Sequence, residues 1–376
     1  MAEWIERKLG EVTALTTKGI TPKYTDRESG NTVRVLNQKC NRNFQISYGE
    51  SRIHNEAIKK VPENKYLCTG DVLINSTGIG TAGRVAQILN VPVPTTIDGH
   101  MILMRATKEI DTLYYGYAVK SFQKKIESLA EGSTGQTEIN RRRLLEEIII
   151  RFPKEKRVQK SIGTFLFQID EKIRNNFCIN NNLEQQAQAI FDNMFPNISN
   201  GSCAIGDYIT PKRGKSLLSK NAIFGNIPVI AGGLEPSTYH NVANTQSPVL
   251  AISASGANAG YVSLWNIPIW SSDSSYIDSS MTDDVYFWYV LLKKRQKEIF
   301  DAQTGSAQPH IYPQHIASMS VSNLDIEEVH SYTSIVTPIF EIIGHHKEEN
   351  TRLASLRDTL LPKLMSGELD VSNIEI

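Results

Sequence analysis

Two long stretches of the chain carry apolar residues at alternating spacings of four and three. The first covers residues 162–194, and the second covers residues 335–367 at an offset of 173. This is the heptad pattern of helices that pack along one seam. The predicted seam residues are Ile162, Leu166, Ile169, Ile173, Leu183, Ile190, Ile335, Ile339, Ile342, Leu353, Leu356 and Leu360.

Polar residues stand in the middle of both seams, at Asn176 and Asn180 in the first helix and at His346 and Glu349 in the second. Polar seam residues fix the register of a helix pair at some cost in stability. We therefore expect the two helices, each roughly 50 Å long, to form an antiparallel coiled coil with one another. The alternative is that each helix packs only on the globular segment beside it.

The segments between the helices are also repeated. VLINSTGIGTAGRV at 72–85 resembles VLAISASGANAGYV at 249–262, and GSTGQTEI at 132–139 resembles GSAQPHI at 305–311. The segment openings match as well, at 9–22 and 205–216. Their offset of 196 exceeds the offset of 177 between the first pair, so the first copy holds about twenty extra residues. The sequence thus contains an internal duplication, and each copy is a globular segment followed by a long helix.

Short runs rich in β-branched residues, such as 34–36, 72–75, 148–152, 249–252 and 319–321, predict strands. Helical stretches follow at 113–129 and 285–300. The expected fold class is α+β, with two similar domains that have twisted, mainly antiparallel sheets. The expected boundaries are 1–153 for the first domain, 154–200 for the first long helix, 201–327 for the second domain, and 328–376 for the second helix and tail.

Composition narrows the class of protein. The 376 residues are 40% hydrophobic and 21% charged, which is ordinary for globular domains. No apolar run approaches the ~20 residues that span a bilayer, and four scattered cysteines without a C-x-x-C pair fit a reducing compartment. We therefore expect a cytoplasmic protein with no membrane segment. The net charge is zero, with 21 basic against 17 acidic residues over 1–150 and 8 against 11 over 201–330.

Several motifs that would indicate catalysis or cofactor binding fail on inspection. Gly78, Gly80 and Gly83 fit G-x-G-x-x-G, but Pro92 and Pro94 leave no room for the helix that receives a pyrophosphate. No Asp, Glu or Cys constellation accompanies the pairs His310/His315 and His345/His346, so no metal site is expected. The chain has no Pro-Pro and no Pro-Cys dipeptide, which DNA methyltransferases use around the reacting base. We expect a chain that recognises a ligand and is not an enzyme.

The order of TGDVLINSTGIGTAGRV, GSTGQTEINRRRL and LEQQAQAIFDNMF, followed by SPVLAISASGANAGYV, TGSAQPHIYPQHI and LRDTLLPKLMSGELDV, resembles the specificity subunit of type I DNA restriction–modification systems. The resemblance covers essentially the whole chain. It implies two target recognition domains, each reading one half of an asymmetric bipartite site in double-stranded DNA, with the helix pair setting the spacer. It also implies two methyltransferase subunits and restriction subunits as partners. S-adenosylmethionine, ATP and Mg would be bound by those partners, with no cofactor in this chain.

Base reading uses hydrogen-bonding side chains on exposed loops. The predicted DNA-binding residues are Thr17, Lys18, Lys23, Ser76, Thr77, Gln136, Arg141, Arg142, Lys212, Arg213, Lys215, Ser253, Ser255, Asn258, Gln308, His310 and Tyr312. The glycine-rich turns could instead only shape the sheet, and residues 141–143 could be a solvated helix start. An alternative for the whole chain is a duplicated-domain scaffold that binds protein or glycan and has no role on DNA.

Overall fold

The computed structural model describes residues 3–132, 137–305 and 308–369. The chain divides into two compact units. Unit 1 comprises Met1–Lys172 and Arg352–Ile376, and unit 2 comprises Ile173–Thr351. Each unit therefore takes part of both long helices. No helix in the described part of the chain is long and apolar enough to cross a membrane.

Unit 1 contains two four-stranded sheets. The first is antiparallel, with the order β2 (Thr13–Lys18), β11 (Met101–Ala106), β8 (Val72–Asn75) and β9 (Val85–Gln87). The second has the order β10 (Thr95–Ile97), β4 (Thr32–Leu36), β7 (Arg52–Asn55) and β3 (Tyr24–Thr25), and only its β10–β4 pair is parallel. Three short pairs complete the unit: β1 (Trp4–Lys8) with β14 (Ile149–Pro153), β5 (Asn41–Arg42) with β6 (Gln45–Ile46), and β12 (Ala130–Glu131) with β13 (Glu138–Ile139).

The helices of unit 1 cover one sheet and form its core. Asp111 caps α1 (Thr112–Ser121) by accepting hydrogen bonds from two backbone N–H groups, as an Asx cap does. Tyr114, Tyr115 and Tyr117 of α1 are buried with strand residues of β8 and β11. The other short helices are α2 (Gln123–Ser128), α3 (Arg141–Glu147), and the 3-10 turns η1 (Leu9–Val12), η2 (Gln38–Cys40) and η3 (Glu63–Lys65).

Unit 2 repeats this arrangement. Its sheets have the orders β16 (Lys212–Arg213), β22 (Ser274–Asp278), β19 (Val249–Ser253), β20 (Val262–Trp265), and β18 (Thr238–His240), β17 (Ile227–Ile230), β21 (Trp270–Ser271). β15 (Cys203–Ala204) pairs with β23 (Ser320–Val321). Its short helices are α5 (Val285–Lys294), α6 (Gln296–Asp301), α7 (Pro313–Ala317), η4 (Ile205–Asp207) and η5 (Ser219–Asn221).

The two units share their strand order, except that β3 of unit 1 has no counterpart in the three-stranded sheet of unit 2. β2-β11-β8-β9 corresponds to β16-β22-β19-β20, and the parallel pair β10–β4 corresponds to β21–β17. The duplication and the α+β class predicted from sequence are confirmed. The extra residues of the first copy lie in two places: residues 37–51 join β4 to β7 where only 231–237 join β17 to β18, and 56–71 precede β8 where only 241–248 precede β19.

Several predicted boundaries are wrong by a few residues. The strands begin at Thr32 and Ile149, and one extends to Ser253. The stretches 113–129 and 285–300 are each two helices, because the chain breaks at Phe122 and Arg295. The long helices start earlier than their heptads, at 156 and 326, since nothing in an apolar spacing marks a polar first turn.

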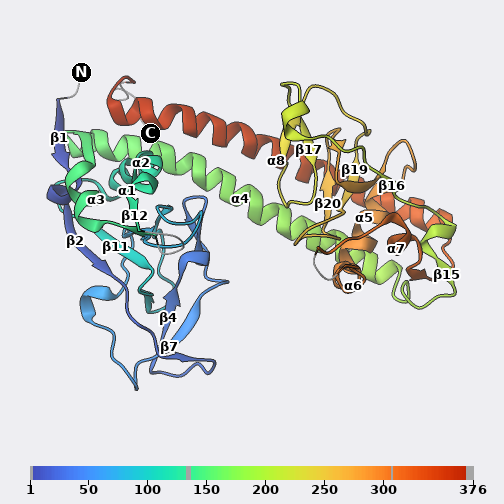
Figure 1. Ribbon diagram of the computed structural model, residues 1–376, viewed down its shortest axis with the longest axis horizontal. Coiled ribbons are helices and arrows are strands. Elements are labelled where there is room, and N and C mark those ends of the chain that lie inside the picture. Colours follow the sequence, from blue (N-terminus) through green and yellow to red (C-terminus); the bar gives the residue numbers. More distant parts are fainter. Residues whose placement is uncertain (1–2, 133–136, 306–307, 370–376) are drawn as a thin grey trace. The chain divides into compact units, whose positions relative to one another are not determined.

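The long helices α4 (Lys156–Met194) and α8 (Ile326–Ser366) pair in antiparallel fashion within each unit. In unit 1 the start of α4 lies beside the end of α8 (Figure 1), where Ile162 and Leu166 share a core with Leu361 and Leu364. In unit 2, Asn176 Nδ2 donates to Asn350 Oδ1 at 2.9 Å. Further along α4, Asn180 Oδ1 lies 2.7 Å from His346 Nδ1, and Ala187 O accepts from the Tyr332 hydroxyl at 3.1 Å.

The predicted seam of the second helix is displaced by one residue. Ile335, Ile342 and Leu356 are 49%, 44% and 47% exposed, whereas the buried residues of α8 include Val336, Phe340, Ile343, Asn350, Leu361 and Leu364. The buried row thus follows the predicted row by one residue, although the predicted Glu349 and His346 still bond to Asn176 and Asn180. Apolar residues occupy both adjacent rows of α8, so the sequence pattern alone could not distinguish them. Ile339, Leu353 and Leu360 are half-buried beside the true seam.

The first helix places its seam where the heptad predicted it. Ile162, Leu166, Ile169 and Ile173 are buried, and Leu183 and Ile190 are half-buried. The polar layer in its middle is buried too, since Asn176 is fully enclosed and Asn180 is 7% exposed. Removing the hydrogen-bond partner of a buried amide reduces the free energy of unfolding by more than a neutral hydrogen bond contributes to it.

A second polar cluster lies in unit 1, around Asp170 of α4. Arg357 Nη1 and the Tyr117 hydroxyl donate to its two carboxylate oxygens at 2.5 and 2.7 Å. Lys120 Nζ lies 3.7 Å from the same carboxylate and 4.2 Å from the centre of the Phe44 ring. Burial lowers the pKa of Lys120 to about 8, against the opposing attraction of Asp170.

We predict that the seam amides act as a pair. Asn176→Ala should destabilise the protein by about 1–3 kcal/mol, because it leaves the Asn350 amide buried without this partner. The double change Asn176→Leu with Asn350→Leu should be less destabilising than Asn176→Ala, because both buried amides are removed and only the half-buried Glu349 loses a donor. Urea denaturation of the three proteins measures the free energies. A double variant less stable than Asn176→Ala would contradict the pairing.

We predict that Lys120 destabilises the protein near neutral pH. Its pKa is lower in the folded state than the ~10.4 of an unfolded lysine, so the unfolded state binds more protons between about pH 8 and that value. The penalty is therefore complete below pH 8 and disappears as pH rises toward 10.5. Lys120→Met should be more stable than the parent by up to about 3 kcal/mol at pH 7, and the difference should shrink by pH 10.

Denaturation at several pH values tests this, with the exposed Lys124→Met as a control that should show no such convergence. A constant difference between Lys120→Met and the parent from pH 7 to pH 10 would exclude a depressed lysine pKa.

Candidate nucleic-acid interface

In unit 1, the turn that follows β8 lies against the β12–β13 hairpin. Ser76 O accepts a hydrogen bond from Ile139 N at 2.8 Å, and Thr77 forms a bridge with Glu138. The Thr77 hydroxyl also lies 3.1 Å from His100 Nδ1. The predicted residue Gln136 lies outside the described residues. The structure therefore joins two sequence motifs that are about sixty residues apart.

Lys18, at the end of β2, forms an ion pair with Glu138 of the same hairpin. Lys18, Glu131, Glu138, Asn140 and Arg141 line one open pocket. Predicted residues from three segments, Lys18, Thr77 and Arg141, are thus brought together. Thr17 lies in β2 opposite Leu103, and Lys23 lies at the start of the other sheet.

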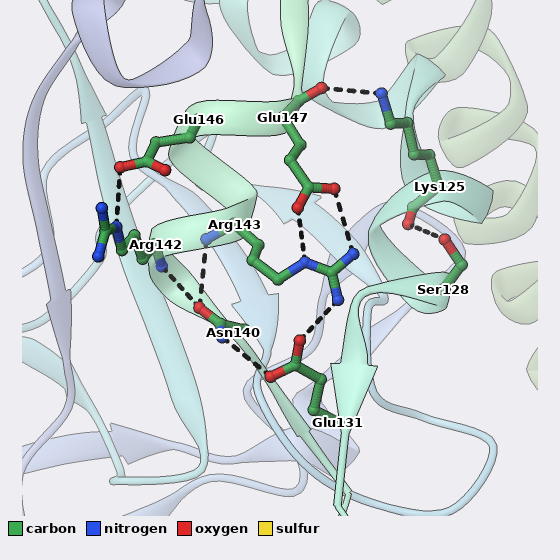
Figure 2. A network of polar contacts seen from close by, with 8 residues as sticks. All are labelled: Lys125, Ser128, Glu131, Asn140, Arg142, Arg143, Glu146 and Glu147. Atoms are coloured by element: carbon green, nitrogen blue, oxygen red, sulfur yellow. Dashed lines mark hydrogen bonds and ion pairs between the residues drawn. The ribbon is translucent and has the colours of Figure 1, made fainter.

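The three consecutive arginines at the start of α3 differ in their partners. Figure 2 shows Arg142 directed to Glu146 and Arg143 directed to Glu147 and Glu131. Asn140 caps the helix and donates to Glu131, and the hydrogen bonds from Asn140 and Arg143 lower the pKa of that carboxyl. Arg141 makes no ion pair with any described residue and is exposed. Of the two predicted arginines, Arg141 is therefore the one whose charge is not already compensated.

Unit 2 builds the same framework from other side chains. Ala254 O accepts from Ile311 N at 2.9 Å, as Ser76 O accepts from Ile139 N, and Ser255 bridges to His310 as Thr77 bridges to Glu138. These shared hydrogen bonds make Ser255 the counterpart of Thr77, and His310 the counterpart of Glu138.

The ion pairs in the two frameworks differ. Arg213 Nη2 lies 2.6 Å from Asp273 Oδ1, and the Ser255 hydroxyl donates to the same carboxylate. Strand register makes Arg213 the counterpart of Lys18. Lys18 pairs with Ile102, which lies opposite Ile74 in β8. Arg213 pairs with Ser275, which lies opposite Ile252 in β19, and Ile74 and Ile252 each stand two residues before the turn carbonyl that bonds to the hairpin. The acidic partner has moved from the hairpin, at Glu138, to the end of the neighbouring strand, at Asp273.

Aromatic rings extend this site in unit 2. The His310 and Tyr312 rings stack at 6.0 Å, and His315 packs edge-on against Tyr312, which is 46% exposed. Gln308 is exposed on the same hairpin, and Asn258 is half-buried in the turn after β19. Lys212 is exposed on β16, and Lys215 lies in the following loop, where its carbonyl accepts from Trp270 Nε1 at 2.8 Å.

Two predicted residues are poor candidates for DNA contact. Ser76 is fully buried and Ser253 is 3% exposed, so both shape the turn. Four neighbours were missed: Gln38, whose amide donates to Thr77 O at 2.7 Å, and His100, Glu138 and Asp273. Glu138 stood inside a repeated motif and could have been chosen. The others come from segments with no matching pattern in the second copy.

The glycine-rich segment is a turn, as expected. Gly78, Gly80 and Gly83 all have positive φ, and β9 begins at Val85 with no helix after the glycines. A Cβ on Gly83 would lie 2.7 Å from Glu127 Cα, so this glycine permits close packing on α2. Among the residues that the structure describes, no three His, Cys, Asp or Glu side chains gather to hold a metal ion.

Comparisons with known proteins agree with this architecture. The family model of the type I restriction modification DNA specificity domain matches residues 1–185. The MjaIX specificity subunit of a type I restriction enzyme from Methanocaldococcus jannaschii is 25% identical over 425 residues, covering 99% of this chain and 95% of that protein. A Mycoplasma genitalium protein named as a type I specificity subunit is 26% identical over 274 residues, covering 68% of this chain and 71% of its own.

The crystal structure of a type I restriction-modification S subunit from M. genitalium matches with a TM-score of 0.60 at 20% identity. It covers 97% of this chain and 96% of that one, which shows a shared fold. The domain match in the first copy and the full-length similarity to a specificity subunit point to one family. Residues 1–185 thus match the DNA specificity domain of type I restriction–modification systems, and nearly the whole chain is similar to a specificity subunit of such a system.

Proposed function

We propose that each unit reads one half of an asymmetric bipartite site in double-stranded DNA. The observation that carries this proposal is the duplicated framework, in which a strand-end turn is bonded to a hairpin beside a basic residue. Exposed hydrogen-bonding side chains on such loops can read base edges in the major groove. The basic residue of each unit, Lys18 or Arg213, is available to a phosphate or a guanine if its carboxylate partner is displaced.

The two half-sites differ in sequence because the two frameworks offer different groups. Unit 1 offers Thr77, His100 and Arg141 around a lysine, and unit 2 offers Ser255, His310 and Tyr312 around an arginine. Arginine contacts guanine in a bidentate manner, whereas lysine is a point charge. A symmetric DNA site would not match these two sets of donors.

The helix pair sets the spacer between the half-sites and docks two methyltransferase subunits, through which restriction subunits join. The partners bind S-adenosylmethionine, ATP and Mg, and this chain performs no chemistry. Its net charge of zero fits this division, because the partners supply most phosphate contacts. The complex acts on DNA in the cytoplasm.

The direct test is to express the chain with the methyltransferase subunit encoded beside it, in a host free of DNA methylation. Sequencing that detects modified bases should find one bipartite motif with two unlike halves and a fixed gap. Omitting this chain, as the control, should abolish the motif. Methylation of a single continuous motif, or of the same motif without this chain, would contradict the proposal.

We predict that lengthening both helices lengthens the gap. Asn180 faces His346 in the antiparallel pair, so one heptad is inserted after Asn180 and one before His346. Seven residues add ~10 Å at 1.5 Å per residue, or about three base pairs at 3.4 Å each. Both half-sites should be unchanged in the methylated motif. A four-residue insertion at the same points is the control, because it shifts the phase of the seam. Altered half-sites with an unaltered gap would show that the helices do not set the spacer.

We predict different effects for two neighbouring arginines. Arg141→Ala should weaken binding to all duplexes and make the salt dependence shallower by about one unit of slope, as the loss of one phosphate contact does. Arg142→Ala is the matched control, with a smaller effect because Glu146 already compensates this charge. Titration of the assembled complex with duplex DNA at several salt concentrations measures both. Equal losses for the two variants would contradict the assignment.

A further inference from the structure

An exposed aromatic ring stands at the same place in both units, and no sequence motif marks it. In unit 1, Lys23 N donates to His54 Nδ1 at 2.8 Å, and the next residue is Tyr24. In unit 2, Ile223 N donates to His240 Nδ1 at 3.0 Å, and the next residue is Phe224. Both histidines are buried, at 0% and 6% exposure. The shared contact makes Phe224 the counterpart of Tyr24.

The two rings differ in what covers them. The guanidinium of Arg52 lies over the Tyr24 ring, 3.4 Å from its centre, and Tyr24 is 38% exposed. Arg52 stands two residues before His54, and the residue two before His240 is Thr238. A threonine cannot cover a ring in this way, and Phe224 is 95% exposed. Leu218 and Ile223 of the same loop are 55% and 60% exposed, and a group of exposed apolar side chains indicates a surface that is covered in a complex.

The backbone beneath Phe224 is held firmly. His240 accepts the Ile223 N–H and packs edge-on against Trp270 at 5.1 Å between ring centres. A Cβ on Gly225 would lie 2.3 Å from His240 O, so glycine allows the loop to lie directly on β18. The ring is therefore presented from a fixed support, which lowers the entropy lost on binding.

The charge around the ring selects the partner. Residues 214–226, which lead from β16 to Phe224, contain Lys215 and Lys220 and no acidic residue. Trp270 links this loop to the candidate interface, because its indole donates to Lys215 O while its ring packs on His240. An exposed ring on a loop that carries lysines and no acid matches duplex DNA, where phenylalanine can enter a base step while lysines contact phosphates.

We propose that Phe224 wedges into a base step of the DNA half-site read by unit 2, and that His240 positions it. This inference rests on the proposed function and adds a contact that reads the deformability of a step rather than base edges. In unit 1 the Arg52 guanidinium covers the corresponding ring, so Tyr24 does not enter a step. The two units thus differ in how they engage DNA, as well as in their polar groups.

The test uses the complex with its methyltransferase subunits and a duplex carrying the motif found by methylation sequencing. The fluorescent adenine analogue 2-aminopurine, placed in turn along the unit 2 half-site, should brighten at one step with the parent complex. Phe224→Ala should abolish that signal and weaken binding about tenfold, within the range for loss of one base–aromatic contact. The salt dependence should not change, because no phosphate contact is lost. Phe224→Trp should restore both.

Phe177→Ala removes a ring that is 59% exposed on α4 and is the matched control, with no effect on the fluorescence signal. For His240, His240→Ala should weaken binding less when Phe224 is already alanine, since a positioning residue acts through the ring. Effects that simply add would overturn this role.

The outcomes separate the two proposals. If methylation by the parent complex shows no bipartite motif, the proposed function is contradicted. A parent complex that binds its motif specifically, while Phe224→Ala binds equally well, would overturn only the wedge. A Phe224→Ala chain that no longer binds the methyltransferase subunit would show that the ring contacts protein and not DNA, and would also overturn it.

Discussion

The antiparallel pairing of α4 with α8 is the constraint on which both units depend. Each unit needs residues from both helices: Leu361 and Leu364 complete the core around Ile162 in unit 1, and Tyr332 packs with Phe191 in unit 2. Both helices are continuous through the unit boundaries. A slip in register would therefore break the Asp170–Arg357 and Asn176–Asn350 contacts together. The polar layers therefore specify one register, although Asn176 Oδ1 and Asn350 Nδ2 make no hydrogen bond with any described residue in it.

Duplication of the scaffold leaves the reading groups free to diverge. The hydrogen bonds that join the strand-end turn to the hairpin are made by backbone atoms, from Ser76 and Ile139 in one unit and Ala254 and Ile311 in the other. The side chains of these four residues take no part in the hydrogen bonds between the turn and the hairpin. The acid that pairs with the basic residue could consequently move from Glu138 to Asp273 without loss of the framework. A fixed backbone can therefore carry different polar side chains in the two units.

The sequence predicts features that repeat at a constant spacing and misses those that do not. The heptads located α4 and its polar layer, and the matched turns located Thr77 and Ser255. The seam of α8 was misplaced by one residue, because apolar residues fill two adjacent rows and only their burial in the structure distinguishes them. Tyr24 and Phe224 were missed, because 30 residues separate Tyr24 from His54 whereas 16 separate Phe224 from His240. Their equivalence exists only in the hydrogen bond that each loop makes.

Compensated charge explains how a chain with no net charge can serve in DNA recognition. Arg142, Arg143 and Arg213 all face carboxylates within the protein, and Lys18 does as well. Uncompensated arginines would bind any phosphate backbone, which raises affinity for all DNA and lowers the ratio of specific to non-specific binding. A basic group held by Glu138 or Asp273 becomes available only where a base or phosphate outcompetes that carboxylate. Under the proposed function, discrimination then depends on contacts that can displace these carboxylates, and the bulk attraction for DNA would come from the partner subunits.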